Sequence, residues 1–151
     1  MQSTTQSADT QRDHQAIRDM LEDWRQACLT RDVARVMTHY ANDIVAFDAI
    51  GALQFKGIEA YGAHYAACMQ MCPGAMVFEI HQLQLHTENQ IGYGHYLLRC
   101  GHQQEDGSEA ASWMRVTVGL RRTDQGWRIA HDHFSAPFDP ESGKTVFDLQ
   151  P

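Results

Sequence analysis

Long alternating segments in the second half of the chain constrain its fold most. Residues 76–86 alternate between apolar and polar side chains, with Met76, Phe78 and Ile80 on one face and a bulge near residues 81–82 that shifts the later leucines. Further strand-like segments follow at 91–101, 110–122 and 127–135, separated by turn-forming residues at 103–107 and 123–126. Consecutive long strands joined by short turns predict an antiparallel meander.

Helical patterns precede this meander. Apolar residues recur at helical spacing over 13–30 and again over 33–40, where Asp32 is suited to cap the second helix. A short strand is predicted at 44–50, a brief partner at 53–55 and another helix at 58–69, which the break at 72–74 stops. Helices followed by an antiparallel sheet are typical of α+β proteins. We therefore expect a curved mixed or antiparallel β-sheet wrapped by N-terminal helices into a cone with an internal pocket.

Size and charge narrow the classes of function. A chain of 151 residues is the size of one domain, and its net charge of -7 disfavours binding to nucleic acid or to anionic membranes. No apolar run approaches the roughly 20 residues that span a bilayer, and the polar residues 1–12 lack the features of a secretory signal. The sequence predicts a disordered leader over 1–12, a domain over 13–138 and a C-terminal tail over 139–151. We expect a cytoplasmic protein.

The cysteines are scattered along the chain, at Cys28, Cys68, Cys72 and Cys100. In a cytoplasmic protein they are expected to be reduced. Cys68 and Cys72 lie one helical turn apart, a spacing more typical of small core residues than of a disulfide or a zinc site.

The last predicted strand carries two histidines. Side chains alternate along an extended strand, so one face is expected to hold Trp127, Ile129, His131 and His133. The other face then holds Arg128, Ala130, Asp132 and Phe134. If the first face lines an enclosed space, two imidazoles there can exchange protons near neutral pH. The alternative is that both histidines only cap the end of a core strand.

Two segments resemble known proteins. Residues 40–51, Tyr-Ala-Asn-Asp-Ile-Val-Ala-Phe-Asp-Ala-Ile-Gly, resemble the helix-to-strand passage of ketosteroid isomerases, and residues 126–135 are similar to the last strand of SnoaL-like proteins. Both groups belong to the nuclear transport factor 2-like superfamily, whose cystatin-like fold is a curved sheet wrapped around an apolar pocket by N-terminal helices. The resemblance covers about residues 13–138. The resemblance is specific for the fold but not for the reaction, because the superfamily includes isomerases, cyclases, hydrolases and non-catalytic modules.

The resemblance also implies roles for individual residues. Asp48 falls where ketosteroid isomerases place the carboxylate that moves the proton, and Tyr65 falls on a tyrosine of their hydrogen-bonded network. Trp24, however, lies where their oxyanion-stabilising tyrosine would be, and Val118 lies near the place of their protonated carboxylic acid. Loss of one such donor typically lowers the rate around a hundredfold or more, so a faithful ketosteroid isomerase is not expected.

The resulting hypothesis is a pocket for a small, mostly apolar molecule that contains a carbonyl group. It includes cofactor-free isomerase or cyclase chemistry, with Asp48 as the base and His131 or His133 as the acid. The predicted substrate-binding residues are Trp24, Tyr40, Tyr65, His95, Arg99, Met114, Val116 and Val118. Which face of the strand at 91–101 lines the pocket stays open, because a single bulge reverses it. We also expect a homodimer through the outer face of the sheet.

Two alternatives remain at this stage. The first is a non-catalytic ligand-binding or assembly module of the same fold. The second is a metal-dependent enzyme, in which His131 and His133 bind zinc or iron together with His95 or Asp48.

Overall fold

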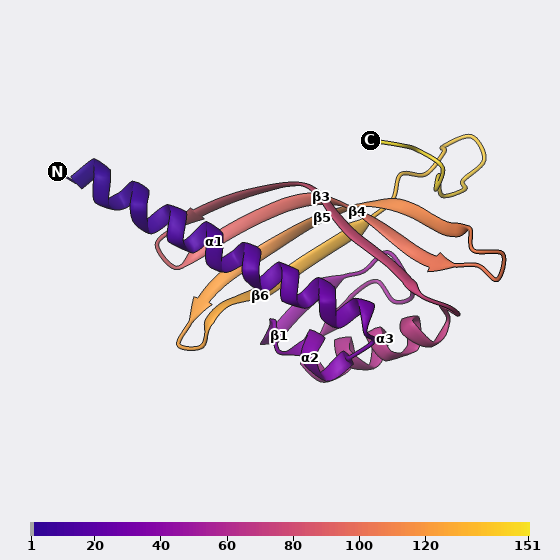
Figure 1. Ribbon diagram of the computed structural model, residues 1–151, viewed down its shortest axis with the longest axis horizontal. Coiled ribbons are helices and arrows are strands. Elements are labelled where there is room, and N and C mark those ends of the chain that lie inside the picture. The colour runs from indigo at the N-terminus through magenta and orange to yellow at the C-terminus, as the bar shows by residue number, and fades with distance from the viewer. Residues whose placement is uncertain (1) are drawn as a thin grey trace.

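The computed structural model describes residues 2–151, and side chains from residue 7 onward. Its elements are α1 (Gln2–Leu29), α2 (Val33–Met37), β1 (Tyr40–Phe47), β2 (Phe55–Lys56), α3 (Ile58–Gln70), β3 (Met76–Glu88), β4 (Ile91–Gln103), β5 (Glu109–Thr123) and β6 (Gly126–Ser135). The strands form one sheet in the order β2-β1-β6-β5-β4-β3, in which only the β1–β6 pair is parallel among the described residues. Figure 1 shows α1 running along this curved sheet, with α2 and α3 beside the C-terminal end of α1. The predicted α+β fold with a curved mixed sheet is confirmed.

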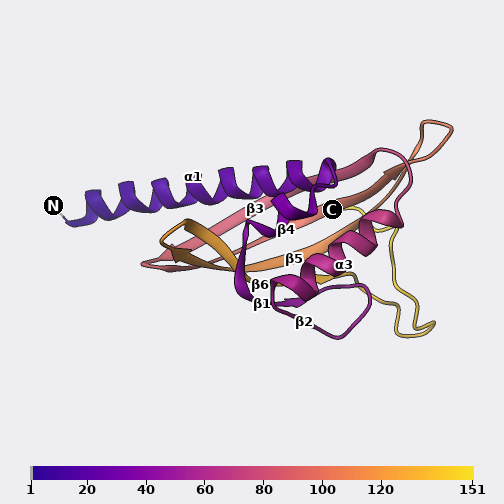
Figure 2. The same ribbon diagram turned by 90° about the horizontal axis from the view of Figure 1, so that it is seen from below.

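The helices cover the inner side of the sheet. Ile17, Leu21, Trp24 and Cys28 recur every three or four residues along α1 and are buried. The Trp24 ring meets the ring of Phe78 on β3 edge to face, with 5.1 Å between the centroids. Figure 2 shows the strands curving from β3, beside α1, to β1 and β2, beside α3. The core therefore lies between this curve and the helices.

The first helix is longer than predicted. It begins at Gln2, so residues 2–12 are helical where the sequence predicted a disordered leader, and residue 1 lies outside the described residues. No glycine or proline interrupts residues 1–29, and the carboxylate of Asp9 lies 2.6 Å from the guanidinium of Arg12 one turn on. Nothing in the sequence of this polar segment stops a helix, and the side chains of residues 7–12 are mostly exposed. No helix in residues 2–151 is both long and apolar enough to cross a membrane.

Two bulges decide which side chains face inward. In β3 the pairing with β4 shifts between His81 and Gln84, and Gln82 has a φ of 57°, which confirms the predicted bulge. In β6, Ile129 pairs with Leu120 and His131 pairs with Gly119. Ala130, between them, has no partner on β5 and forms a bulge.

The bulge at Ala130 corrects the predicted faces of the last strand. Trp127 and Ile129 are buried before it, but after it the buried side chains are those of Asp132 and Phe134. His131 and His133 therefore do not share the inner face with Trp127 and Ile129, as the sequence predicted. An extra residue reverses a strand's two faces because the side-chain period is two.

Residues 136–151 form the tail that follows β6. They contain one isolated bridge, between Phe138 and Thr145, and otherwise no helix or strand. Figure 1 shows the tail folding back on itself at the end of the sheet, away from α1.

Candidate active site

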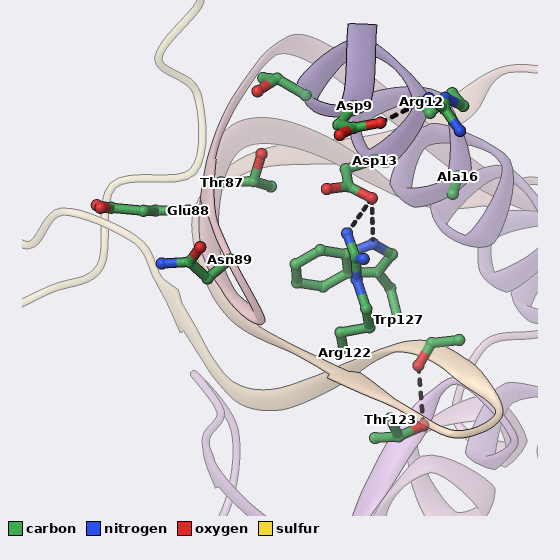
Figure 3. Close-up of a pocket in the computed structure, with 12 residues that line it drawn as sticks. Asp9, Arg12, Asp13, Ala16, Thr87, Glu88, Asn89, Arg122, Thr123 and Trp127 are labelled. Atoms are coloured by element: carbon green, nitrogen blue, oxygen red, sulfur yellow. Dashed lines mark hydrogen bonds and ion pairs between the residues drawn. The ribbon is translucent and has the colours of Figure 1, made fainter. Parts of the chain in front are cut away.

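Two of the hollows in the molecule differ sharply in character. The larger, of about 940 Å³, lies between α1 and the β3–β4 and β5–β6 turns (Figure 3). The carboxylate of Asp13 pairs with the guanidinium of Arg122 and accepts a hydrogen bond from the indole nitrogen of Trp127 at 3.4 Å. These contacts join α1 to the sheet, which is a structural role.

The second hollow is a cavity of about 140 Å³ inside the curve of the sheet. Its lining is mostly apolar or sulfur-containing and comes from both helices and strands: Cys28, Asp48, Ile50, His64, Tyr65, Cys68, Met69, Met71, Cys72, Met76, Phe78, Leu98, Cys100, Met114 and Phe134. A cavity of about 150 Å³ accommodates benzene, so this one fits a ligand of about one six-membered ring. An apolar cavity with a few convergent polar groups is the usual form of a small-molecule site.

Asp48 is one of those polar groups, and its position is fixed from three sides. It follows β1 directly, on the same face as the buried Ala46. Its Oδ1 accepts a hydrogen bond from the backbone N–H of Ile50 at 3.0 Å, and its Oδ2 lies 3.3 Å from Nε2 of His64. The hydroxyl of Tyr61 lies 3.5 Å from the same Oδ2. The carboxylate therefore has a defined orientation at the cavity wall.

A second carboxyl group, Asp132 of β6, lies behind this wall. It is completely buried, and the hydroxyl of Tyr61 lies 3.0 Å and 3.2 Å from its two oxygens. Burial raises the pKa of Asp132 to about 7, and the nearby charge of Asp48 adds to the rise, whereas hydrogen bonds from Tyr61 and Tyr40 oppose it. Asp132 therefore gains or loses its proton near neutral pH.

A chain of hydrogen bonds leads from α1 to the cavity. Nε1 of Trp24 donates to the hydroxyl oxygen of Tyr40 at 3.1 Å, and this oxygen lies 2.8 Å from the hydroxyl oxygen of Tyr65. Burial raises the pKa of both tyrosines well above the ordinary value, so both stay protonated. Because an indole N–H can only donate, Tyr40 keeps its own hydroxyl proton, which it can give to Tyr65 or to Asp132. When Tyr40 donates to Tyr65, the proton of Tyr65 is available for a ligand in the cavity.

The structure places some of the predicted site residues at the cavity. Asp48, Tyr65 and Met114 line it, and Trp24 and Tyr40 lie behind it in the hydrogen-bond chain. Val116 and Val118 are buried in the core next to this region but do not line the cavity.

Other predicted residues lie on the outer face of the sheet. His131 and His133 pack edge to face against the ring of Phe47, at 4.8 Å and 5.6 Å, and Nδ1 of His131 donates to the carbonyl oxygen of Val45 at 2.6 Å. The prediction that these histidines enter the pocket is wrong in geometry, because the bulge at Ala130 turns them outward.

The open question of the strand at 91–101 is also settled by burial. Gly94, Tyr96 and Leu98 of β4 are buried, so the alternate residues point away from the cavity. His95 is exposed, and Arg99 pairs with Glu79 at 3.1 Å and with Glu109 at 2.5 Å. Neither therefore binds a ligand in the cavity.

Sequence reasoning missed Asp132, Tyr61 and His64. Strict alternation places Asp132 on the face opposite Trp127 and Ile129, and the bulge at Ala130 reverses this. Tyr61, His64 and Cys68 recur at helical spacing on α3, and this stripe of polar groups was the available signal.

The predicted metal set is not assembled. His131 and His133 lie on the opposite face of the sheet from Asp48. Among the side chains of residues 7–151, no group of three or more His, Cys, Asp or Glu residues is arranged to hold a metal ion.

Comparison with known proteins agrees with this architecture. The SnoaL-like domain family matches residues 17–139. A protein of unknown function from Pseudomonas putida KT2440, described as nuclear transport factor 2-like, is 48% identical, with 94% of this chain and 98% of that chain covered and a TM-score of 0.85. No curated protein matches the chain.

More distant solved structures share the fold alone. One is a nuclear transport factor 2-like protein with a cystatin-like fold from Novosphingobium aromaticivorans, at 14% identity, 89% and 88% coverage and a TM-score of 0.74. Another is a candidate dehydratase of the nuclear transport factor 2-like family from Streptomyces avermitilis, at 13% identity, 83% and 96% coverage and a TM-score of 0.73.

Proposed function

The chain belongs to the SnoaL-like domain family, and from the geometry of its cavity we propose that it binds a small, mostly apolar carbonyl compound and isomerises it by acid–base catalysis. The observation that carries the proposal is that Asp48 and Tyr65 both line one apolar cavity. The first can accept a proton, and the second has a hydroxyl proton to donate. The cavity volume of about 140 Å³ limits the substrate to about one ring.

In the proposed reaction, Asp48 removes a proton from the carbon next to the carbonyl group. The charge that develops on the carbonyl oxygen is stabilised by the hydroxyl of Tyr65, which Tyr40 and Trp24 hold in place from behind. Asp48 then returns the proton to the far carbon of the resulting dienolate, which moves the double bond into conjugation. The protein ends in its starting protonation state.

His64 and Asp132 act through Asp48 in this proposal. Nε2 of His64 and the backbone N–H of Ile50 orient the carboxylate of Asp48. Asp132 shares the hydroxyl of Tyr61 with Asp48, so a protonated Asp132 avoids a second negative charge beside the base. Both are positioning residues, since neither is required to touch the substrate.

The test is the conversion of 3-cyclohexen-1-one into 2-cyclohexen-1-one, followed by the absorbance of the conjugated product. Asp48→Asn is expected to lower the rate by about a hundredfold or more, because general bases typically contribute 10²–10⁴-fold. Tyr65→Phe is expected to lower it by about a hundredfold, the usual effect of losing one oxyanion donor. The matched control is Asp43→Asn, an exposed aspartate of β1 that pairs with Arg121 outside the cavity.

Two outcomes contradict the proposal. Equal rates in the wild type and in Asp48→Asn remove Asp48 from the mechanism. A wild type that is thermally stabilised by cyclohexanone but converts no 3-cyclohexen-1-one indicates instead a non-catalytic ligand-binding protein of the same fold.

We also propose that the protein forms a homodimer through the outer face of its sheet. Ile91 and Tyr93 of β4 are 62% and 51% exposed on this face, and Phe47 of β1, which β6 and β5 separate from β4, is 38% exposed. Sedimentation of the wild type and of Tyr93→Asp tests this, with a dimer expected for the first and a monomer for the second. A monomeric wild type contradicts it.

A further inference from the structure

All of the chain's cysteines reach the same cavity. Cys28, Cys68, Cys72 and Cys100 each line it, and all are free thiols. Among the described residues, Cys68 is the cysteine whose sulfur contacts an imidazole, at 3.9 Å from Nδ1 and 3.6 Å from Nε2 of His64. This contact with an imidazole distinguishes Cys68 from the other three cysteines.

The imidazole in turn contacts a carboxylate. His64 and Cys68 are four residues apart on α3 and so lie on one face of the helix. Nε2 of His64 lies 3.3 Å from Oδ2 of Asp48, and the His64 ring stacks on Phe55 with 4.1 Å between the centroids. A thiol, an imidazole and a carboxylate therefore contact one another along the cavity wall. Nε2 of His64 is the nitrogen nearer to both Asp48 and Sγ, so when Nε2–H donates to Asp48, Nδ1, at 3.9 Å from Sγ, is the nitrogen that can take the thiol proton.

The thiol of Cys68 is held in its neutral form at rest. Burial raises its pKa, and the nearby Asp48 and Cys72 raise it further. A neutral thiol reacts slowly unless a neighbouring base removes its proton during the attack, and His64 occupies that position.

The cavity is also accessible to a reactant from solvent. Ile50 and Met71 both line it, and they are 47% and 65% exposed. These side chains form an apolar mouth through which a small uncharged molecule can reach the sulfur.

We propose that Cys68 adds covalently to α,β-unsaturated carbonyl compounds held in this cavity. His64 takes the proton from Sγ while Sγ bonds to the β carbon, and the double-bond electrons move onto the carbonyl group as an enolate. His64 then returns the proton to the α carbon, so the product is a saturated thioether and no oxidant or reductant is consumed. The inference rests on the proposed carbonyl-binding function and adds that conjugated products are trapped at Cys68.

The experiment incubates the full chain with 2-cyclohexen-1-one and measures intact mass, followed by peptide mapping. One adduct on Cys68 is expected, and His64→Gln is expected to slow its formation at least about tenfold. The matched control is His95→Gln, which removes an exposed imidazole outside the cavity and should leave the rate of adduct formation on Cys68 unchanged. Circular dichroism and thermal unfolding verify that each variant is folded.

Several results overturn the inference. An adduct on Cys72 instead of Cys68, or equal adduct rates in the wild type and a folded His64→Gln, removes the activated thiol. If cyclohexanone stabilises the protein against heat while 2-cyclohexen-1-one forms no adduct, covalent addition at Cys68 is contradicted and carbonyl binding in the cavity is supported. If neither ketone has any effect, the carbonyl pocket fails as well.

Discussion

Replacing Asp132 with asparagine removes the buried carboxyl group whose ionisation the fold opposes. Burial raises the pKa of this group from 3.8 to about 7. At a pH between these two pKa values, Asp132 keeps its proton in the folded protein but has released it in the unfolded chain. The folded state is therefore favoured most below about pH 4. The contribution of Asp132 to stability is then lost as the pH rises toward 7 and above.

The size of this effect follows from the pKa difference. One pKa unit corresponds to about 1.36 kcal/mol, so a rise of roughly three units amounts to about 4 kcal/mol. Asparagine has nearly the same shape and cannot ionise. The free energy of unfolding of Asp132→Asn, minus that of the wild type, is therefore expected to increase by about 4 kcal/mol between pH 4 and pH 8.

The assay is urea unfolding at several pH values in this range, followed by tryptophan fluorescence. Asp43→Asn serves as the control: Arg121 lowers the pKa of Asp43 below its ordinary value of 3.8, so its contribution to stability is lost only as the pH falls below about 4, and its difference from the wild type should be nearly flat from pH 4 to pH 8. A difference between Asp132→Asn and the wild type that is flat from pH 4 to pH 8, or that falls with pH, refutes the reasoning. Asp132 would then not be a carboxyl group with a raised pKa.

Three further changes test other parts of the structure. Trp24→Phe removes the indole donor to Tyr40 and should lower the free energy of unfolding by about 1–2 kcal/mol, measured with urea; an unchanged value contradicts the hydrogen-bond chain. Gly101→Ala places a Cβ against the backbone of Ala110 and should lower the free energy of unfolding by about 3 kcal/mol or more. An unchanged free energy of unfolding would show that β4 and β5 lie further apart. His133→Gln should leave the conversion of 3-cyclohexen-1-one within about twofold of wild type, because the imidazole lies outside the cavity; a loss like that expected for a general acid, about a hundredfold, restores its predicted role.

The fold could be predicted because its signals are periodic and repeated. Apolar residues at helical spacing around Trp24 and strict alternation around Phe78 each specify one element, and the order of these elements specifies an α+β sheet. The bulge near Gln82 was also visible, since the leucines after it change phase. The helical start of α1 was not, because residues 2–12 carry no apolar stripe and are helical only in continuation of the segment that follows.

The site was predictable only in part. Asp48 and Tyr65 were found through a resemblance and do line the cavity. His131 and His133 were placed on the wrong face, and Asp132 was missed, for a single reason: the pairing of Gly119 and Leu120 leaves Ala130 unpaired. That bulge depends on how two strands align, and its trace in the sequence is that Phe134 falls out of phase with Trp127 and Ile129.

The central claim is that Asp48 removes a proton next to a bound carbonyl group. The most direct measurement is the exchange of the α protons of cyclohexanone for deuterium in D₂O, followed by proton NMR with wild type and Asp48→Asn at equal concentration. The account predicts that the wild type accelerates the exchange and that Asp48→Asn loses about a hundredfold or more of this acceleration. Equal exchange rates with both proteins contradict it.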